Sequence, residues 1–441
     1  MLWKRLPGVL VPHRKNTAQQ APVLLPCPGA VCIPMGMHIG APAKPVVSPG
    51  DHVAVGQLIA EAGGFVSAPV HASVSGTVKK IDEVRLAGGR TMQAIFLEAD
   101  GLQTPDPSLT PPRMENTEDF LAAVRASGVV GLGGAGFPTA VKLTVKDLSQ
   151  IETILINGAE CEPYITSDTR TMLDDAPLLA SGAALLRKFL KTEHIVFAVE
   201  RNKPQCIEAL RQALRDQPTV QVRALPSMYP QGGEKVLIYN LTGRMVPEGK
   251  LPLDVGAVVL NCTTLAALTR YIQTGMPLVQ KCVTVDGPAV REPKNVLAPI
   301  GTALEELFRF CGGFISEPRK ILYGGPMMGL AAADLTAPVL KNTNAVLAFD
   351  EKSAAPREPD ACIHCGRCMR GCPLGLMPME IEFAYARANL EELDRLKTNL
   401  CMECGCCSYA CPAGRPLTQT NRLAKAKLAA WKAAQREKEG K

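Results

Sequence analysis

The rhythm of hydrophobic and polar positions changes several times along the chain, and each rhythm predicts a different structure. Residues 39–97 hold short apolar stretches broken by Gly and Pro, which is typical of an all-β unit. Residues 102–116 contain four prolines and no periodicity, which predicts a linker. Beyond the linker, apolar β-branched runs alternate with helical patterns. This alternation predicts a parallel α/β sheet covered by helices.

The expected elements after the linker follow from the same patterns. In the α/β part they are strands at 153–157, 194–199, 219–225 and 257–261, with helices near 171–191 and 203–215. A small α+β unit follows, with a strand at 281–285 and a helix at 302–310. Regularity is lost from 332 to 360. An Ala-rich basic helix is expected at 417–439.

Length and composition place the chain among ordinary folded proteins with several domains. It has 441 residues, of which 46% are hydrophobic and 20% are charged, so global disorder is excluded. No run approaches 18 consecutive apolar residues, so no membrane span is expected. Residues 1–20 offer no small-residue cleavage site, which predicts an unprocessed cytoplasmic protein.

The formal charge of +6 is concentrated at the C-terminal end. Residues 421–441 hold seven Lys or Arg and two Glu, so the rest of the chain is nearly neutral. A broad basic face for nucleic acid is therefore not expected. The basic tail is most simply a solvated helix end, and contact with acidic lipid or an acidic partner is the alternative.

The cysteines carry the strongest chemical signal. Nine of the sixteen lie between Cys362 and Cys411, where the spacing C-x2-C-x2-C-x3-C-P occurs twice. In this motif three cysteines bind one [4Fe-4S] cluster and the fourth reaches the other cluster. The predicted ligands are Cys362, Cys365, Cys368 and Cys411 for cluster 1, and Cys372, Cys401, Cys404 and Cys407 for cluster 2. Structural zinc is the weaker alternative because zinc prefers separated C-x2-C pairs, and Cys406 is expected to be a bystander.

Three further segments are candidates for ligand binding. The glycine-dense stretch 128–136 precedes Lys142, and its backbone N–H groups could close on a phosphate or a ring, although a structural turn is equally compatible with it. The segment 157–163 follows a predicted strand and carries Glu160 and Glu162 where α/β sheets bind ligands. The segment 229–235 is a third turn rich in glycine and polar residues.

These residues together resemble the RnfC/RsxC family, a component of the Rnf (Rsx) ion-translocating oxidoreductase. The resemblance spans nearly the whole chain and is most specific in 38–46, in 229–235 and in the doubled cysteine motif. The central part is also similar to the flavin-binding subunit of respiratory NADH:quinone oxidoreductase, whose motif G-x-G-G-A-G-F-P-T matches 131–139.

The resemblance implies a multidomain α/β fold. The implied parts are an N-terminal β barrel-sandwich hybrid (1–101), a Rossmann-like α/β domain for FMN and NADH (117–275), an SLBB β-grasp unit (276–330), a bacterial-type two-cluster ferredoxin domain (355–416) and the basic helix (417–441). The first part resembles half of a lipoyl or biotinyl carrier. A carrier lysine is missing from its tip at 61–65, so covalent cofactor attachment is not expected.

The resemblance also implies residue roles and partners. The implied FMN contacts are Gly131, Gly133, Lys142, Asn157, Glu160, Gly232, Asn261 and Thr264, while Phe137, Glu162 and Glu234 face NAD(H), the two glutamates as catalytic residues. NADH then reduces FMN, and the two clusters carry single electrons to or from other Rnf subunits and a ferredoxin, which drives Na⁺ or H⁺ translocation. The chain is expected peripherally on the cytoplasmic side of the inner membrane.

Two alternatives stay open at this point. One is a soluble flavin and iron–sulfur reductase similar to cobalamin reductase, which shares these parts. The other is a docking subunit that holds clusters without flavin. Ala159 and Gly233 motivate the second alternative, since the flavin-binding family carries acids at these two positions.

Overall fold

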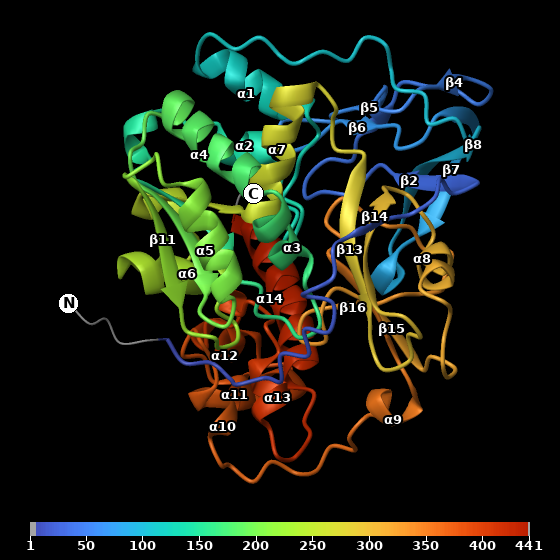
Figure 1. Ribbon diagram of the computed structural model, residues 1–441. Helices are drawn as coiled ribbons and strands as arrows, with labels where there is room; N and C mark the ends of the chain where they lie inside the picture. Colours follow the sequence, from blue (N-terminus) through green and yellow to red (C-terminus); the bar gives the residue numbers. More distant parts are fainter. Residues whose placement is uncertain (1–5, 440–441) are drawn as a thin grey trace.

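The computed structural model describes residues 6–439 and arranges them as four β-sheets with surrounding helices (Figure 1). Within these residues no helix is both long enough and apolar enough to cross a membrane.

Two small antiparallel sheets share one apolar core in the N-terminal unit. Their strand orders are β2-β8-β7-β4 and β3-β5-β6. The strands are β2 (Ala30–Pro34), β3 (Lys44–Pro45), β4 (His52–Val53), β5 (Leu58–Glu61), β6 (Val70–His71), β7 (Gly76–Arg85) and β8 (Thr91–Ala99). Ile33, Ile59 and Ile95 come from three of these strands and are fully buried in the common core. The expected all-β unit is confirmed, and it begins earlier than predicted, at β2.

A parallel sheet with the strand order β11-β10-β9-β12 forms the centre of the second unit. Its strands are β9 (Thr153–Gly158), β10 (Ile195–Glu200), β11 (Val220–Leu225) and β12 (Ala257–Asn261). The accompanying helices are α1 (Thr117–Ala126), α2 (Thr139–Leu143), α3 (Ser167–Asp174), α4 (Ala176–Leu190), α5 (Pro204–Ala213), α6 (Glu234–Thr242) and α7 (Cys262–Thr274). Ile154, Leu155 and Ile156 are consecutive and all buried, so both faces of β9 are covered. The predicted parallel α/β sheet is confirmed.

The single helix expected near 171–191 is wrong, because two helices occupy this stretch. Helix α3 ends at Asp174 and α4 begins at Ala176, with Pro177 in its first turn. Proline has no N–H to donate and its ring clashes with the carbonyl four residues earlier, so a helix can begin at this position but cannot run through it.

A six-stranded mixed sheet with the order β1-β14-β13-β17-β15-β16 forms the third unit. Its elements are β1 (Val23–Leu24), β13 (Gln280–Asp286), β14 (Lys294–Pro299), α8 (Leu304–Phe310), β15 (Lys320–Tyr323), β16 (Leu330–Ala331) and β17 (Ala345–Phe349). The strand and the helix predicted for the small α+β unit are both confirmed.

The expectation that 332–360 is irregular is wrong in its middle. Strand β17 lies inside the sheet, parallel to β13 and antiparallel to β15, and all five of its residues are buried. The sequence Ala-Val-Leu-Ala-Phe is a continuous apolar run without alternation, as expected for a central strand that is covered on both faces.

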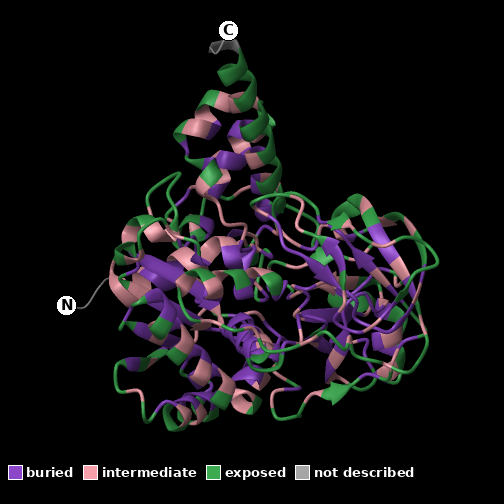
Figure 2. Ribbon diagram, turned by 90° about the horizontal axis from the view of Figure 1, so that it is seen from above, coloured by how far each residue is buried: buried purple, intermediate pink, exposed green. Residues whose placement is uncertain are grey.

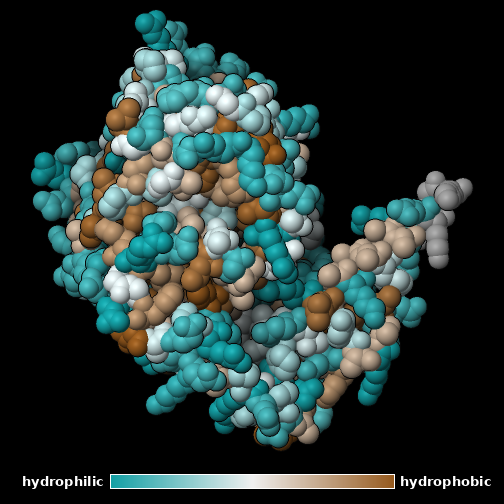
Figure 3. All heavy atoms as spheres, turned by 90° about the vertical axis from the view of Figure 1, so that its right-hand side faces the viewer, coloured by the Kyte–Doolittle hydropathy of each residue, from teal (hydrophilic) through white to brown (hydrophobic). Residues whose placement is uncertain are grey.

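Short helices and one long helix build the cysteine-rich unit. They are α9 (Glu351–Ala354), α10 (Arg367–Arg370), α11 (Pro378–Ala386), α12 (Leu390–Arg395), α13 (Cys406–Ala410) and α14 (Leu417–Glu439). Ala424 and Leu428 of α14 pack with Ile381 and Leu393 in one apolar cluster. The last turns of α14 stand away from the body (Figures 2 and 3), and residues 433–437 are exposed. The expected C-terminal helix is confirmed.

Candidate functional site

The strand order reverses between β9 and β12, and two asparagines mark this point. Asn157 on β9 and Asn261 at the end of β12 are partners in the parallel register. Open α/β sheets bind ligands in the crevice outside the carboxyl ends of such strands. Asn157 Nδ2 donates to the carbonyl of Gly232 at 2.9 Å, and Asn261 Oδ1 accepts from the N–H of Thr264 at 3.1 Å. The structure therefore brings four of the predicted flavin contacts to one edge of the sheet.

The glycine loop, residues 128–136, lies at the same edge. Its backbone folds back on itself, because the N–H of Gly131 donates to the carbonyl of Phe137 at 2.9 Å. A Cβ added to Gly133 would lie 2.5 Å from Asn261 Nδ2, so only glycine allows the loop to approach β12 this closely. Two predicted residues on separate segments are thus in direct contact.

The loop has features that fit a phosphate-bearing flavin. The hydroxyl of Thr139, directly after the loop, is buried and has no hydrogen-bond partner within the described part of the chain. An added Cβ on Gly134 would meet nothing within 4 Å, whereas one on Gly232 would lie 2.4 Å from the carbonyl of Ala159. An open glycine backbone and an unpartnered hydroxyl within one short segment suit a ring or a phosphate that accepts N–H and O–H groups.

Lys142 and Glu234 form an ion pair beside β12. Lys142 on α2 donates to Glu234 Oε1 at 2.9 Å and to the carbonyl of Val259 at 3.0 Å. The two side chains are 28% and 41% exposed, so the pair can be reached by a ligand. Glu234 is the first residue of α6, where the N–H groups of the helix terminus favour a negative charge. A cation and an anion with solvent access therefore face each other above the sheet.

Glu160 is held deeper, beside the N-terminus of α3. Its carboxylate accepts the N–H of Asp168 at 2.7 Å and the hydroxyl of Thr169 at 2.6 Å. Lys15 lies 3.8 Å from Glu160 Oε2, and the side chain of Glu160 is only 3% exposed. Burial raises the pKa of Glu160, an effect that the charge of Lys15 opposes. The carboxylate of this predicted flavin contact is thus occupied by protein groups, and its backbone carbonyl accepts from Lys15 and Lys203 at 2.8 and 3.2 Å.

Glu162 reaches toward the third unit. It accepts the N–H groups of Met327 and Met328 at 3.1 and 2.9 Å, and the hydroxyl of Tyr229 lies 3.4 Å away. A Cβ on Gly325 would lie 2.2 Å from the carboxylate, so this loop packs closely on it. Burial raises the pKa of Glu162 to about 7. The carboxyl group is therefore poised to change its charge near neutral pH.

Sequence reasoning missed two residues that hold the glycine loop from outside. Lys341 is buried and donates to the carbonyls of Pro69 and Gly128 at 2.6 and 2.7 Å. Asn342 donates to the carbonyl of Gly134 at 2.8 Å. Both belong to the stretch expected to be irregular, and neither lies in a motif, so no local signal could have found them.

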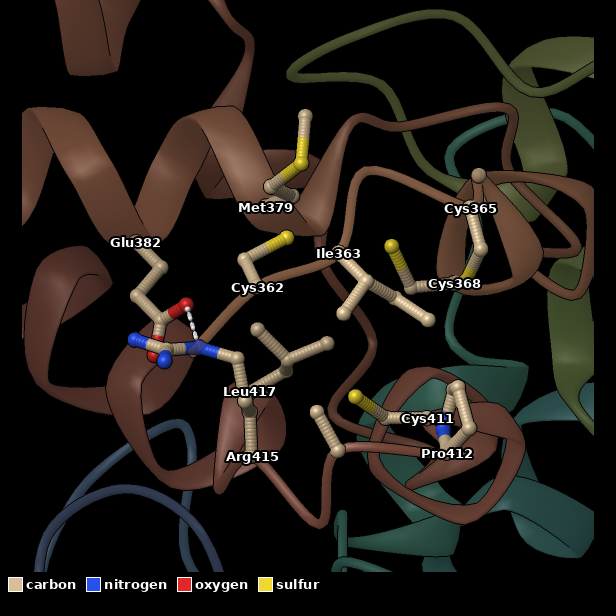
Figure 4. Close-up of a pocket in the computed structure, with 12 residues that line it drawn as sticks. Cys362, Ile363, Cys365, Cys368, Met379, Glu382, Cys411, Pro412, Arg415 and Leu417 are labelled. Atoms are coloured by element: carbon tan, nitrogen blue, oxygen red, sulfur yellow. Dashed lines mark hydrogen bonds and ion pairs between the residues drawn. The ribbon is translucent and has the colours of Figure 1, made fainter. Parts of the chain in front are cut away.

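The eight motif cysteines gather in two groups of four. One hollow of about 360 Å³, including space open to solvent, is lined by Cys362, Cys365, Cys368 and Cys411. A second hollow of about 340 Å³ is lined by Cys372, Cys401, Cys404 and Cys407, together with Cys406. In Figure 4 the sulfur atoms of Cys362, Cys368 and Cys411 point toward the space between them, beside the ion pair of Glu382 and Arg415. In each group the fourth cysteine comes from the other motif.

The chemistry of these groups fits clusters better than single ions. Four thiols surround each hollow, and thiolates are the usual ligands of [4Fe-4S] clusters. In the described residues, no three His, Cys, Asp or Glu side chains are placed to hold one metal ion. The two motifs also share a backbone pattern, with positive φ at His364 and Gly366 in one and at Glu403 and Gly405 in the other. The two motifs therefore adopt the same local backbone conformation at matching positions.

The second hollow lies against the turn 229–235 of the flavin unit. The hydroxyl of Tyr229 donates to the carbonyl of Cys404 at 2.6 Å. A Cβ on Gly233 would lie 2.4 Å from the terminal methyl of Met402, so the turn and the cysteine-rich unit are in close contact here. The first hollow lies on the other side, where Cys365 is exposed and Ile363 is 67% exposed.

A flavin-type α/β domain that touches one of two four-cysteine hollows defines a flavoprotein with iron–sulfur clusters for electron transfer. Family models match in the same order along the chain. They are the RnfC barrel sandwich hybrid domain (3–102), the Nuo51 FMN-binding domain (124–270), the SLBB domain (282–331) and the 4Fe-4S dicluster domain (355–412). The predicted fold class, the FMN and the two [4Fe-4S] clusters are confirmed by these matches.

Curated relatives identify the family. The RnfC-type component of the proton-translocating ferredoxin:NAD(+) oxidoreductase complex of Clostridium ljungdahlii is 42% identical over 83% of this chain and 80% of its own. The corresponding component of the Na(+)-translocating ferredoxin:NAD(+) oxidoreductase complex of Acetobacterium woodii is 41% identical over 87% of each chain. That of the ion-translocating oxidoreductase complex of Rhodobacter capsulatus is 40% identical over 95% of this chain and 81% of its own. The chain belongs to the RnfC family and is part of an oxidoreductase complex, as the sequence predicted.

Among solved structures, a chain of an NAD+-reducing [NiFe]-hydrogenase in the H2-reduced state shares the fold. The TM-score is 0.51 with 20% sequence identity, over 74% of this chain and 67% of that chain. This likeness concerns the fold alone. The family assignment excludes the alternative that this chain is a soluble reductase similar to cobalamin reductase.

Proposed function

We propose that this chain is the peripheral electron-input subunit of an Rnf complex. It passes electrons between NAD(H), FMN and two [4Fe-4S] clusters, so that electron exchange between NADH and ferredoxin drives Na⁺ or H⁺ translocation in partner subunits. One observation carries the proposal: the turn 229–235 contacts the flavin crevice through Gly232 and the second cysteine hollow through Tyr229. The two redox sites are therefore neighbours with no other domain between them.

The crevice residues divide by position. Flavin contacts are assigned to Gly131, Gly133, Lys142, Asn157, Glu160, Gly232, Asn261 and Thr264, and the nucleotide side to Phe137, Glu162 and Glu234. FMN supplies the conversion between a two-electron hydride and single electrons, which a cluster cannot perform. Lys142 supplies a cation at the crevice, with Glu234 as its counter-charge at the start of α6. Glu162 keeps its carboxyl group close to the contact between the units.

The clusters form an ordered relay. Cysteines 372, 401, 404 and 407 hold the cluster next to the flavin unit, and cysteines 362, 365, 368 and 411 hold the outer one. The second hollow, called the inner hollow from here on, packs on Tyr229. Cys365 of the first, outer hollow is exposed. An exposed cluster is suited to exchange electrons with another subunit. The proposal keeps the expected domain limits, which are the barrel-sandwich hybrid (1–101), the FMN and NADH domain (117–275), the SLBB unit (276–330), the two-cluster domain (355–416) and the basic helix (417–441).

An anaerobic titration of the purified chain, supplemented with FMN and using NADH as reductant, tests the proposed function. Flavin bleaching should be followed by two interacting [4Fe-4S] signals in low-temperature EPR. If the clusters are present and NADH reduces neither flavin nor cluster, the chain is a docking subunit without flavin, and the flavin assignment fails.

The basic end of α14 is the proposed contact with the cytoplasmic face of the membrane. Its last described side chains are exposed, and Arg436 has no acidic partner within 4 Å in the part the structure describes. Cationic helix ends bind anionic lipid in a salt-dependent way. Release from membranes by salt should occur at lower concentration when residues 433–441 are removed, a truncation that leaves the buried Ala424 and Leu428 in place. Equal release with and without them would assign attachment to partner subunits alone.

A further inference from the structure

An N-terminal strap, residues 9–18, crosses the functional site and bonds to each of its sides. Val9 and Tyr229 exchange backbone hydrogen bonds of 2.8 and 3.0 Å. The N–H of Tyr164 donates to the carbonyl of His13 at 3.0 Å. Thr17 is fully buried, with its hydroxyl 2.5 Å from that of Thr166. The strap thus joins the turn beside the second cysteine hollow to the segment that follows β9.

Lys15 of the strap is the centre of a small cage of carbonyls. Its ammonium donates to the carbonyls of Glu160, Glu162 and Ile165 at 2.8, 2.7 and 2.6 Å. An ammonium has three N–H donors, so each donor has one acceptor here. We call residues 160–165 the acidic loop. Three of its six carbonyls converge on one cation, which fixes the orientation of its peptide planes.

The strap and the acidic loop meet in backbone conformations that need external support. Arg14 has φ of 45° and Tyr164 has φ of 70°, in the left-handed region. Non-glycine residues are strained there and persist only when surrounding contacts enforce the conformation. The Lys15 cage and the bond between Tyr164 and His13 are such contacts.

The cation is retained in a nearly closed site because its charge is matched. The Lys15 side chain is 14% exposed and lies 3.8 Å from Glu160 Oε2. Lys203 also donates to the Glu160 carbonyl, at 3.2 Å, and forms an ion pair of 2.7 Å with the buried Glu200. Burial lowers the pKa of Lys15, and the charge of Glu160 opposes that change. Lys15 is therefore paired with Glu160, and Lys203 with Glu200, at the acidic loop.

The acidic loop carries this constraint to the redox contact. Cys161 Sγ accepts the N–H of Gly232 at 3.4 Å, and Glu162 accepts the N–H groups of Met327 and Met328. Gly232 in turn accepts the side-chain amide of Asn157. A shift of the loop would therefore move the turn 229–235 and the carboxyl group on the nucleotide side together.

We propose that Lys15 is a positioning residue for the redox site: by holding three carbonyls of the acidic loop it sets the place of Glu162 and of the turn between flavin and inner cluster. This inference rests on the proposed function. Lys15 touches no reacting group itself and acts through the loop.

Hydrogen exchange of the chain measures this positioning without any turnover. In Lys15→Met, which keeps an unbranched side chain one atom shorter and removes the cation, amides in 160–166 and 229–235 should exchange at least about tenfold faster, as expected when a hydrogen bond to a charged group is lost. Lys281→Met is the matched control. Lys281 is also buried, lies in β13, and has no hydrogen-bond partner in the described residues, so exchange in these two segments should stay as in the wild type.

Kinetics and chemical rescue separate positioning from simple loss of stability. Lys15→Ala should raise the KM for NADH about tenfold while flavin and iron contents stay at wild-type values. Propylammonium chloride replaces the missing part of the side chain and should lower the KM again, whereas sodium chloride at equal ionic strength should not. Unchanged exchange in Lys15→Met, or a raised KM that propylammonium does not lower, overturns the inference. Failure of the wild type to oxidise NADH would instead refute the proposed function.

Discussion

The hydroxyl of Tyr229 and the backbone carbonyl of Cys404 are joined by a hydrogen bond of 2.6 Å, which ties the flavin unit to the inner cysteine hollow. Tyr229 is 2% exposed, and the Sγ of Cys406 lies 3.9 Å from the backbone carbonyl oxygen of Tyr229. The contact is therefore buried and closely packed. It is the point at which the two redox domains come together through backbone and side chain.

Replacing Tyr229 by Phe should slow electron transfer from flavin to cluster. The variant leaves a buried carbonyl without its donor at a cost of about 1 kcal/mol, equivalent to roughly a fivefold slower rate if the full cost appears in the barrier. Stopped-flow bleaching of the clusters after NADH mixing measures it. Tyr323→Phe is the control, because Tyr323 donates to the carbonyl of Pro338 at 2.9 Å within the third unit and lines neither cysteine hollow. Equal slowing in both variants would contradict a specific role of Tyr229.

The crossed cysteine groups predict which substitutions affect the same cluster. Cys372→Ser should remove the EPR signal that Cys404→Ser removes, although Cys372 lies in the first motif. Cys411→Ser should match Cys362→Ser in the same way, since these two thiols line one hollow.

Cys406→Ser serves as the control for the cysteine series. Cys406 is fully buried beside the inner hollow and lies outside the ligand pattern, so both EPR signals should remain. If Cys372→Ser and Cys368→Ser removed the same signal, each motif would bind its own cluster and the crossing would be wrong.

Removing the cation of Lys142 should weaken flavin binding. In Lys142→Met the crevice loses a donor with access to a ligand, and Glu234 is left without its partner at 2.9 Å. One charge-assisted hydrogen bond contributes about 1.5–3 kcal/mol, so the Kd for FMN should rise at least about tenfold in fluorescence titrations. Lys146→Met, on an exposed position after α2, should bind FMN as the wild type does. An unchanged Kd in Lys142→Met would remove Lys142 from the flavin site.

The raised pKa of Glu162 predicts that the stability of the folded chain depends on pH. Burial raises its pKa from the ordinary value of 4.5 to about 7, so between these values the folded chain binds more protons than the unfolded chain. Stability should therefore fall as pH rises from 4.5 to 7, by roughly 3 kcal/mol from this group, and then stay level. Glu162→Gln should lose this slope in urea unfolding at pH 5, 6 and 7. A variant with the same slope as the wild type would show that other groups cause it.

Much of the architecture could be predicted because its signals are local. Cysteine spacing, the alternation of strands with helices and the basic Ala-rich end each lie within one stretch of sequence. The predictions failed where context decides the outcome. Pro177 splits a helical pattern by removing a backbone donor, and β17 becomes a strand because two neighbouring strands cover it.

The sequence by itself determined the parallel α/β class of the central part and the ligands of the two clusters, since periodicity and motif spacing depend on neighbouring residues, while the flavin site and the domain identities came from the family resemblance. The tertiary structure alone decided how the parts meet. Lys15 lies 145 residues from the Glu160 carbonyl that it binds, and Tyr229 lies 175 residues from Cys404. Such contacts depend on how separate cores pack together, and no local pattern encodes that packing.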